Sequence, residues 1–163
     1  MFVPTHRVTP RLITLNAHIP RIPNTDELLR SNIHVAVVRG YQFGPAFESL
    51  VGRLALQGRL HVGAAPDDVV KLLSSDRVDA AILPLSAMAD AVEAADLGNR
   101  FRSNILTDLP RVRIGFYIST SSLSESDRTV LRKAITRAVN TGEYQRLMRR
   151  HYPSWSLPDV TSD

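Results

Sequence analysis

The stretch VAVVRGYQFGP, residues 35–45, joins a buried strand to the start of a helix. Its first four residues are small or β-branched and apolar, which is typical of a strand covered on both faces. Gly40 and Gly44 permit a tight turn, and Pro45 is well placed as the first helical residue because its missing N–H would be unpaired there anyway. The stretch therefore predicts a strand, a turn and a helix in direct succession.

The same succession recurs on both sides of this stretch. Short strands are predicted at residues 12–15, 34–38, 59–63 and 79–83, and helices after Asn24, from Pro45, from Pro66 and from a cap at Ser86 to about residue 95. Strands that alternate with helices of about ten residues predict an α/β fold, with a parallel-type sheet flanked by helices.

The C-terminal part has one more strand and two helices. The strand is predicted at 112–118, and Ser124 caps a long helix with Asp127 as its capping-box partner. Residues 140–142 break that helix, and a last one runs from Glu143 to Tyr152. Apolar residues at helical spacing are expected on the buried face of the long helix: Leu131, Ala134, Ile135 and Ala138. The tail from residue 154 to 163 is expected to be loosely held.

Composition excludes several classes of protein. With 44% hydrophobic and 22% charged residues, the 163-residue chain is typical of globular domains. Without cysteine it has no disulfides, thiolate metal sites or thiol catalysis. No stretch is apolar enough to span a membrane, and the first residues do not have the pattern of a signal peptide.

The net charge of +4 raises the possibility of a nucleic-acid partner. Basic residues gather in the C-terminal helices, where we expect them on solvated faces: Arg128, Arg132, Lys133, Arg137, Arg146, Arg149 and Arg150. Aromatic residues make up only 6% of the chain and do not alternate with basic ones, so no nucleic-acid binding is predicted.

Signals of catalysis and of metal binding are weak. The five histidines stand singly, without a pair at i, i+3 or i, i+4, and no serine lies in a nucleophile-elbow motif. The sequence therefore predicts no metal site, no cofactor and no enzymatic activity. The turn at 39–44 is the best candidate site, because amide groups at a helix N-terminus suit a carboxylate or a phosphate, and open α/β sheets bind ligands at the carboxyl ends of their strands. The alternative is that Gly40 and Gly44 only shape a tight turn.

Three motifs resemble those of one family in order and spacing. Residues 35–40 (VAVVRG), residues 76–82 (DRVDAAI) and residues 141–144 (TGEY) with Tyr152 are similar to motifs of the polar amino-acid class of bacterial extracellular solute-binding proteins. The resemblance implies a type-2 periplasmic binding protein, with residues 17–111 as its second, ligand-closing lobe. Residues 1–16 and 112–163 would be the crossing strands, near 12–15 and 113–118, and the remainder of the first lobe. A long segment that normally precedes the first crossing has no counterpart here.

What the resemblance implies is capture of a small polar or anionic solute by lobe closure, in the periplasm, for an ABC permease. The ligand positions that it carries over are Arg39, Gly40, Tyr41, Gln42, Phe43, Pro84 and Leu85. The acidic residue that usually pairs with the ligand's α-amino group falls at Pro84, which implies an anionic or neutral ligand. Alternatives on the same fold are a cyclohexadienyl-dehydratase-like enzyme and a sensor or effector-binding module. With much of the first lobe absent, we expect a homodimer formed by exchange of the C-terminal helices.

Overall fold

The computed structural model describes residues 1–15, 17–98, 100–158 and 160–162. The chain forms two compact units. Unit 1 consists of Met1–Val8 together with Val112–Asp163, and unit 2 is Thr9–Arg111. The first division therefore comes earlier than the expected one at residues 16 and 17. The reason is that the strand expected to cross between lobes, near 12–15, pairs entirely within the sheet of unit 2.

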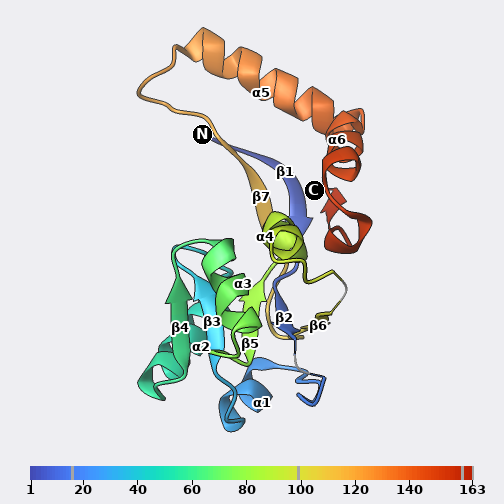
Figure 1. The fold of residues 1–163 in the computed structure, drawn as a ribbon. Coiled ribbons are helices and arrows are strands. Elements are labelled where there is room, and N and C mark those ends of the chain that lie inside the picture. Colours follow the sequence, from blue (N-terminus) through green and yellow to red (C-terminus); the bar gives the residue numbers. More distant parts are fainter. Residues whose placement is uncertain (16, 99, 159, 163) are drawn as a thin grey trace. The chain divides into compact units, whose positions relative to one another are not determined.

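Unit 2 is built on a five-stranded sheet in the order β4-β3-β5-β2-β6 (Figure 1). The strands are β2 (Arg11–Thr14), β3 (Val35–Val38), β4 (Leu60–Gly63), β5 (Ala80–Leu83) and β6 (Arg102–Ile105). The predicted parallel pairing is confirmed for β3 with β4 and with β5, but β2 is antiparallel to both of its neighbours, so the sheet is mixed. Arg11, where β2 begins, lies opposite Leu83 and Ile105, so the chain enters and leaves this sheet at the carboxyl ends of the parallel strands.

Helices cover both faces of this sheet. They are α1 (Thr25–Arg30), α2 (Pro45–Leu56), α3 (Pro66–Ser74), the 3-10 turn η1 (Leu85–Met88) and α4 (Ala89–Ala94). The connection through α2 leads from β3 to β4, and the connection through α3 leads back past β3 to β5. Because both crossovers take the same hand, the two helices lie on opposite faces, with α3 in front of the sheet in Figure 1.

Most local signals in unit 2 are confirmed. Asn24 accepts a hydrogen bond from the Glu27 amide at 2.9 Å, and Pro45 is the first residue of α2. The predicted cap at Ser86 is wrong, because η1 starts at Leu85 and α4 only at Ala89. Pro84 begins this region with φ −66° and ψ 143°, and its carbonyl accepts the Ala87 amide at 3.0 Å, which produces a 3-10 turn before the α-helix.

A buried arginine fixes α1 to the rest of unit 2. Arg59 is 8% exposed, and its guanidinium donates to the carbonyl oxygens of Leu28 at 2.8 Å, Leu29 at 3.1 Å and Ile33 at 2.7 Å. Carbonyls at the end of a helix have no hydrogen-bond donor within the helix. Arg59 supplies donors for the carbonyls of Leu28 and Leu29 at the end of the short helix α1. Arg59 is therefore a structural residue.

Unit 1 contains a three-stranded sheet in the order β7-β1-β8. Its strands are β1 (Phe2–Val8), β7 (Val112–Tyr117) and β8 (Thr161–Ser162). β1 is antiparallel to both, with an irregularity between Pro4 and His6 opposite Gly115. A bulge is where a strand tolerates proline. The expectation of a loose tail is wrong, since β8 pairs with β1 and Ser156 is only 2% exposed.

Two helices complete unit 1, α5 (Glu125–Asn140) and α6 (Glu143–His151), followed by the 3-10 turn η2 (Ser154–Ser156). Ser124 caps α5 as predicted, accepting the Asp127 amide at 3.1 Å, and Gly142, with φ 71°, separates the helices. No residue of α5 or α6 is buried, so the predicted buried face of α5 is wrong. A sheet of three strands is too small to cover both helices. Among the described residues, no helix is long and apolar enough to cross a membrane.

Candidate functional site

The carboxyl ends of β3, β4 and β5 form one edge of the unit 2 sheet. The register places Val38 opposite Gly63, and Val35 and Ala36 opposite Ala80 and Ala81, so these three strands end side by side. Each is followed by a helix or helical turn, and α2, α3 and η1 therefore all begin at this edge. We refer to it as the carboxyl edge. In open α/β sheets this is the edge where ligands bind.

The turn after β3 has the predicted glycine geometry. The Tyr41 amide donates to the Val38 carbonyl at 3.2 Å, which closes a four-residue turn with Gly40 in its third position. Gly40 has φ 80°, the value that a type II turn needs at that position and that other residues adopt only with strain. The Arg39 amide donates to the carbonyl of Gly63 at 2.8 Å and so ties the turn to the end of β4.

The remaining amides of the turn point to a binding role. Within the described part of the chain, the N–H groups of Gly40, Gln42 and Phe43 have no hydrogen-bond partner, whereas that of Tyr41 is used by the turn. Gly44, the N-cap residue that precedes α2, has φ 88° and ψ 177° and offers no side-chain cap. Free amides beside the positive end of a helix dipole favour a negatively charged or carbonyl-bearing ligand.

Aromatic side chains support the turn from the inside. Phe43 is 3% exposed and packs edge-on against Phe47, with ring centroids 4.8 Å apart, and Tyr41 contacts Phe43 at 6.1 Å. Phe43 can therefore contribute only its backbone to a ligand. Burial raises the pKa of Tyr41, which keeps its hydroxyl neutral and able to donate.

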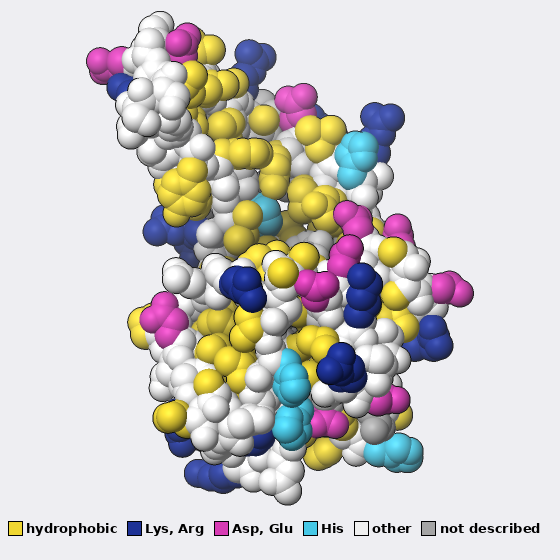
Figure 2. Space-filling model, turned by 60° about the vertical axis from the view of Figure 1, so that its left-hand side comes forward, with side chains coloured by type: hydrophobic (Ala, Val, Ile, Leu, Met, Phe, Trp, Pro, Cys, Tyr) yellow, Lys and Arg dark blue, Asp and Glu magenta, His cyan; other side chains and the backbone are white. Residues whose placement is uncertain are grey.

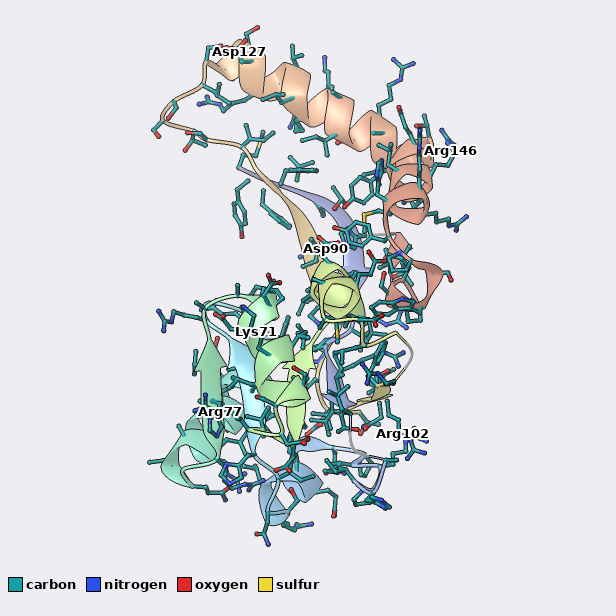
Figure 3. All side chains as sticks on the ribbon, in the orientation of Figure 1. Lys71, Arg77, Asp90, Arg102, Asp127 and Arg146 are labelled. Carbon is teal, nitrogen blue, oxygen red and sulfur yellow. The ribbon has the colours of Figure 1, made fainter. Side chains whose placement is uncertain are left out.

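A basic groove of about 440 Å³ begins beside the turn and runs between β4 and α3 as far as Arg77, which precedes β5. Arg39, Lys71 and Arg77 line it, the last two on α3 and just beyond it (Figure 3). No ion pair or side-chain hydrogen bond is found for these three cations within the described ranges. Asp68, also on the groove, accepts the amides of Ala64 at 2.9 Å and Ala65 at 3.3 Å and so serves the backbone. The groove is positively charged overall. The local sequence around Arg39 did not predict this charge.

Pro84 and Leu85 follow β5 at the same edge but offer no polar side chain. Both are buried, with Leu85 6% exposed. Pro84 has no N–H and carries no charge, so these residues can form only an apolar wall. All seven predicted site residues therefore follow two neighbouring strands, β3 and β5. Lys71 and Arg77 could not be predicted as neighbours of Arg39, because helix α2, strand β4 and part or all of α3 separate them from it along the chain.

The predicted site residues offer backbone amides rather than acidic or imidazole side chains. No group of three or more His, Asp or Glu side chains suited to holding a metal ion occurs among the residues that the structure describes. The positions at the carboxyl edge that we singled out from the sequence include no histidine or carboxylate that would act as a general acid or base.

No protein-family model matches the chain, and no curated protein matches it. Solved structures do match. A histidine kinase sensor domain with similarity to periplasmic binding proteins is 16% identical, with a TM-score of 0.67 over 99% of this chain and 64% of that one. The fold is that of the periplasmic binding proteins.

Two further matches show the same fold in binding proteins. EhuB in complex with hydroxyectoine is 14% identical with a TM-score of 0.65, over 98% of this chain and 62% of that one. The ancestral amino acid-binding protein AncCDT-1, a precursor of cyclohexadienyl dehydratase, is 14% identical with a TM-score of 0.66, over 93% of this chain and 60% of that one. This chain thus spans less than two thirds of the length of the proteins that it matches.

Proposed function

We propose that this chain binds a small anionic or neutral polar solute at the carboxyl edge of unit 2, as the ligand-closing lobe of a periplasmic solute-binding protein. The ligand's acidic or carbonyl oxygens contact the amides of Gly40, Gln42 and Phe43, and Pro84 and Leu85 form the apolar wall. Closure of two lobes around the solute would present it to an ABC permease.

The observation that carries this proposal is the set of unpartnered amides in the turn after β3. A hydrogen bond to a charged group contributes about 1.5–3 kcal/mol, and amides that no internal acceptor satisfies gain most from a ligand. The location supports the same conclusion, because the chain enters and leaves the unit 2 sheet at this edge, at Arg11 and Ile105. Hinges in two-lobed proteins are such element-terminal residues.

The charge of the edge favours an anionic or neutral ligand over an ordinary α-amino acid. Arg39, and Lys71 from the groove along α3, raise the local potential, and Pro84 stands where the resemblance expects an acidic partner for an ammonium group. A buried ammonium without a partner costs several kcal/mol. At about 1.4 kcal/mol per factor of ten, that is a loss in affinity of about a hundredfold or more.

Binding without catalysis fits this edge better than a dehydratase-like activity. Residues 39–43 and Pro84-Leu85 contain no histidine, aspartate or glutamate. A second candidate is a sensor module, supported by the match of a histidine kinase sensor domain over 99% of this chain. The two candidates share the ligand site and differ in the protein that responds to closure.

The test combines a ligand panel with one pair of matched glycine variants. Organic acids and standard amino acids are titrated into the chain by calorimetry, while amide NMR signals of residues 40–43 are followed. We expect Gly40→Ala, which strains the turn at φ 80°, to weaken binding about tenfold, since misplaced amides lose much of a charge-assisted bond. Gly58→Ala imposes a similar strain at φ 66°, with open space around its new methyl group, and lies far from the carboxyl edge.

The outcomes separate the parts of the proposal. Equal weakening by Gly40→Ala and Gly58→Ala would show a general effect of strain and contradict the site. Binding with no change in the signals of residues 40–43 would place the ligand elsewhere. Tighter binding of an ordinary amino acid than of any organic acid would show that the inference from Pro84 is wrong.

A further inference from the structure

Two histidines that stand far apart in the sequence meet at the open edge of the unit 2 sheet. His34 directly precedes β3 and His61 is the second residue of β4, the edge strand. The Nδ1 atom of His34 lies 3.3 Å from the Nε2 atom of His61, and the ring centroids are 5.6 Å apart. Figure 2 shows two histidine side chains in contact on the surface of this unit.

Both imidazoles are carried by backbone that is hydrogen-bonded within the unit 2 sheet or to Asp79. The His34 amide donates to the Asp79 carboxylate at 2.8 Å, and its carbonyl accepts the amides of Asp79 and Ala80 at 3.0 and 3.1 Å. His61 lies opposite Ala36 in the parallel pairing of β3 with β4. Side chains on rigid elements keep their geometry, so ligand binding here costs little ordering of the backbone.

The separation of the two nitrogens matches the spacing of ligands on one metal ion. Two histidine nitrogens bound to tetrahedral Zn²⁺, each at about 2.0–2.1 Å, are themselves about 3.3 Å apart. We infer that His34 Nδ1 and His61 Nε2 form a bidentate surface site for a divalent ion of the zinc, nickel or copper type. Imidazole is a preferred ligand of these ions.

Coordination by these two atoms requires one particular tautomer of each ring. Coordination through His34 Nδ1 and His61 Nε2 places the remaining protons on His34 Nε2 and His61 Nδ1. Neither of those two atoms has a hydrogen-bond partner within the described ranges. Both imidazoles are then neutral, and the ion replaces the single hydrogen that joins the rings. Its other positions are left to water or to a donor from another molecule.

This site is separate from the proposed ligand site. It lies at the amino end of β3 and along β4, whereas the turn at 39–44 follows the carboxyl end of β3. The Asp79 carboxylate beside His34 favours a cation, whereas Arg39 and the free amides of the turn lie at the carboxyl end of β3. Metal binding here therefore tests the structure independently of the proposed function.

The probe is Zn²⁺, titrated into the untagged chain by calorimetry and followed by amide NMR. We expect saturable binding of one Zn²⁺ per chain, with the largest shifts at Val35, Leu60 and Val62, the neighbours of the two histidines. His34→Gln and His61→Gln should each weaken binding about tenfold or more, because loss of a direct ligand costs at least as much as loss of a supporting group. His151→Gln, which removes an exposed histidine on α6, is the matched control and should bind as the unchanged chain does.

Each contrary result would overturn the inference. No saturable binding by the unchanged chain would do so, as would unchanged affinity in both His34→Gln and His61→Gln, or shifts located around another histidine. The NMR shifts of the unchanged chain locate the ion without any substitution. Loss of stability in one of the variants would therefore not obscure the result.

Discussion

We expect His6 to make the stability of unit 1 depend on pH. It is 4% exposed in β1, its Nδ1 lies 2.9 Å from the Thr5 hydroxyl and 3.2 Å from the Tyr144 hydroxyl, and its ring stacks on Tyr144. Burial lowers the pKa of His6 below its usual 6.5. In the unfolded chain the same side chain takes up a proton near pH 6.5, so below that pH the unfolded state binds more protons than the folded state.

We therefore expect the free energy of unfolding to be greatest above pH 6.5 and to fall as pH decreases below it. The slope should approach about 1.4 kcal/mol per pH unit until the lowered pKa is reached. Urea unfolding at pH 7.5, 6.5 and 5.5, read from fluorescence of Trp155, reports on unit 1, because this is the chain's single tryptophan. His6→Gln should remove most of this slope. An equal slope in that variant would show that groups other than His6 cause the pH dependence.

At the scale of single residues, the sequence could predict those roles that depend on near neighbours. Asn24, Pro45, Ser124 and Gly142 act within four residues of themselves, and all four have the predicted roles. It could not predict roles whose partners lie far away in the chain. The backbone carbonyls that accept from Arg59 precede it by 26 to 31 positions, and His61 follows His34 by 27 positions.

At the scale of elements, Gly115 sets the pairing of β7 with β1. A Cβ atom at this position would lie 2.1 Å from the carbonyl oxygen of Val3 and 2.7 Å from Cα of Pro4. Both are backbone atoms at the irregularity of β1, so no side chain can move aside to relieve the contact. We expect Gly115→Ala to destabilise unit 1 by about 3 kcal/mol or more, at or above the upper end of the usual cost of overpacking.

The matched control is the same substitution in a helix. Gly52 lies in α2 with no atom within 4 Å of a new Cβ, so Gly52→Ala should stabilise unit 2 by about 0.5–1 kcal/mol. Trp155 fluorescence monitors unit 1, and the amide signals of β3 and β5 monitor unit 2. If Gly115→Ala leaves the unfolding of unit 1 unchanged, β1 and β7 are not paired in this register.

Elements with a clear apolar pattern were predictable, and those without it were not. β3 and β5 are continuous apolar runs and were predicted correctly. β1 was missed because Pro4, Thr5, His6 and Arg7 interrupt any alternation, and β6 because three of its four residues are polar or charged. The position of the candidate turn was predictable from Gly40 and Pro45. The free amides of this turn were not predictable, because the local sequence does not show which backbone groups find a hydrogen-bond partner in the fold.

At the scale of the whole molecule, unit 1 exposes an extended apolar surface. Figure 2 shows hydrophobic side chains gathered on the unit that contains α5 and α6. The exposed residues come from β7 and both helices: Phe116 at 51%, Tyr117 at 84%, Val130 at 62%, Leu131 at 42% and Leu147 at 47%. The resemblance to a binding protein anticipated this surface, although the sequence pattern alone suggested that α5 is buried.

Because monomeric proteins rarely leave contiguous apolar surface of this kind uncovered, we expect two copies of the chain to associate through α5 and α6 at micromolar concentration. Sedimentation velocity should show a dimer that Leu131→Glu and Leu147→Glu dissociate, since each substitution buries an unpaired carboxylate in the contact.

The control variant, Leu56→Glu, changes a leucine that is 90% exposed in unit 2 and should leave the dimer intact. Because the exposed side chains of this surface are apolar, sulfate, which is excluded from protein surfaces, should strengthen the contact. A monomer at every salt concentration, with no binding of an apolar dye, would contradict association and require that α5 and α6 repack within one chain.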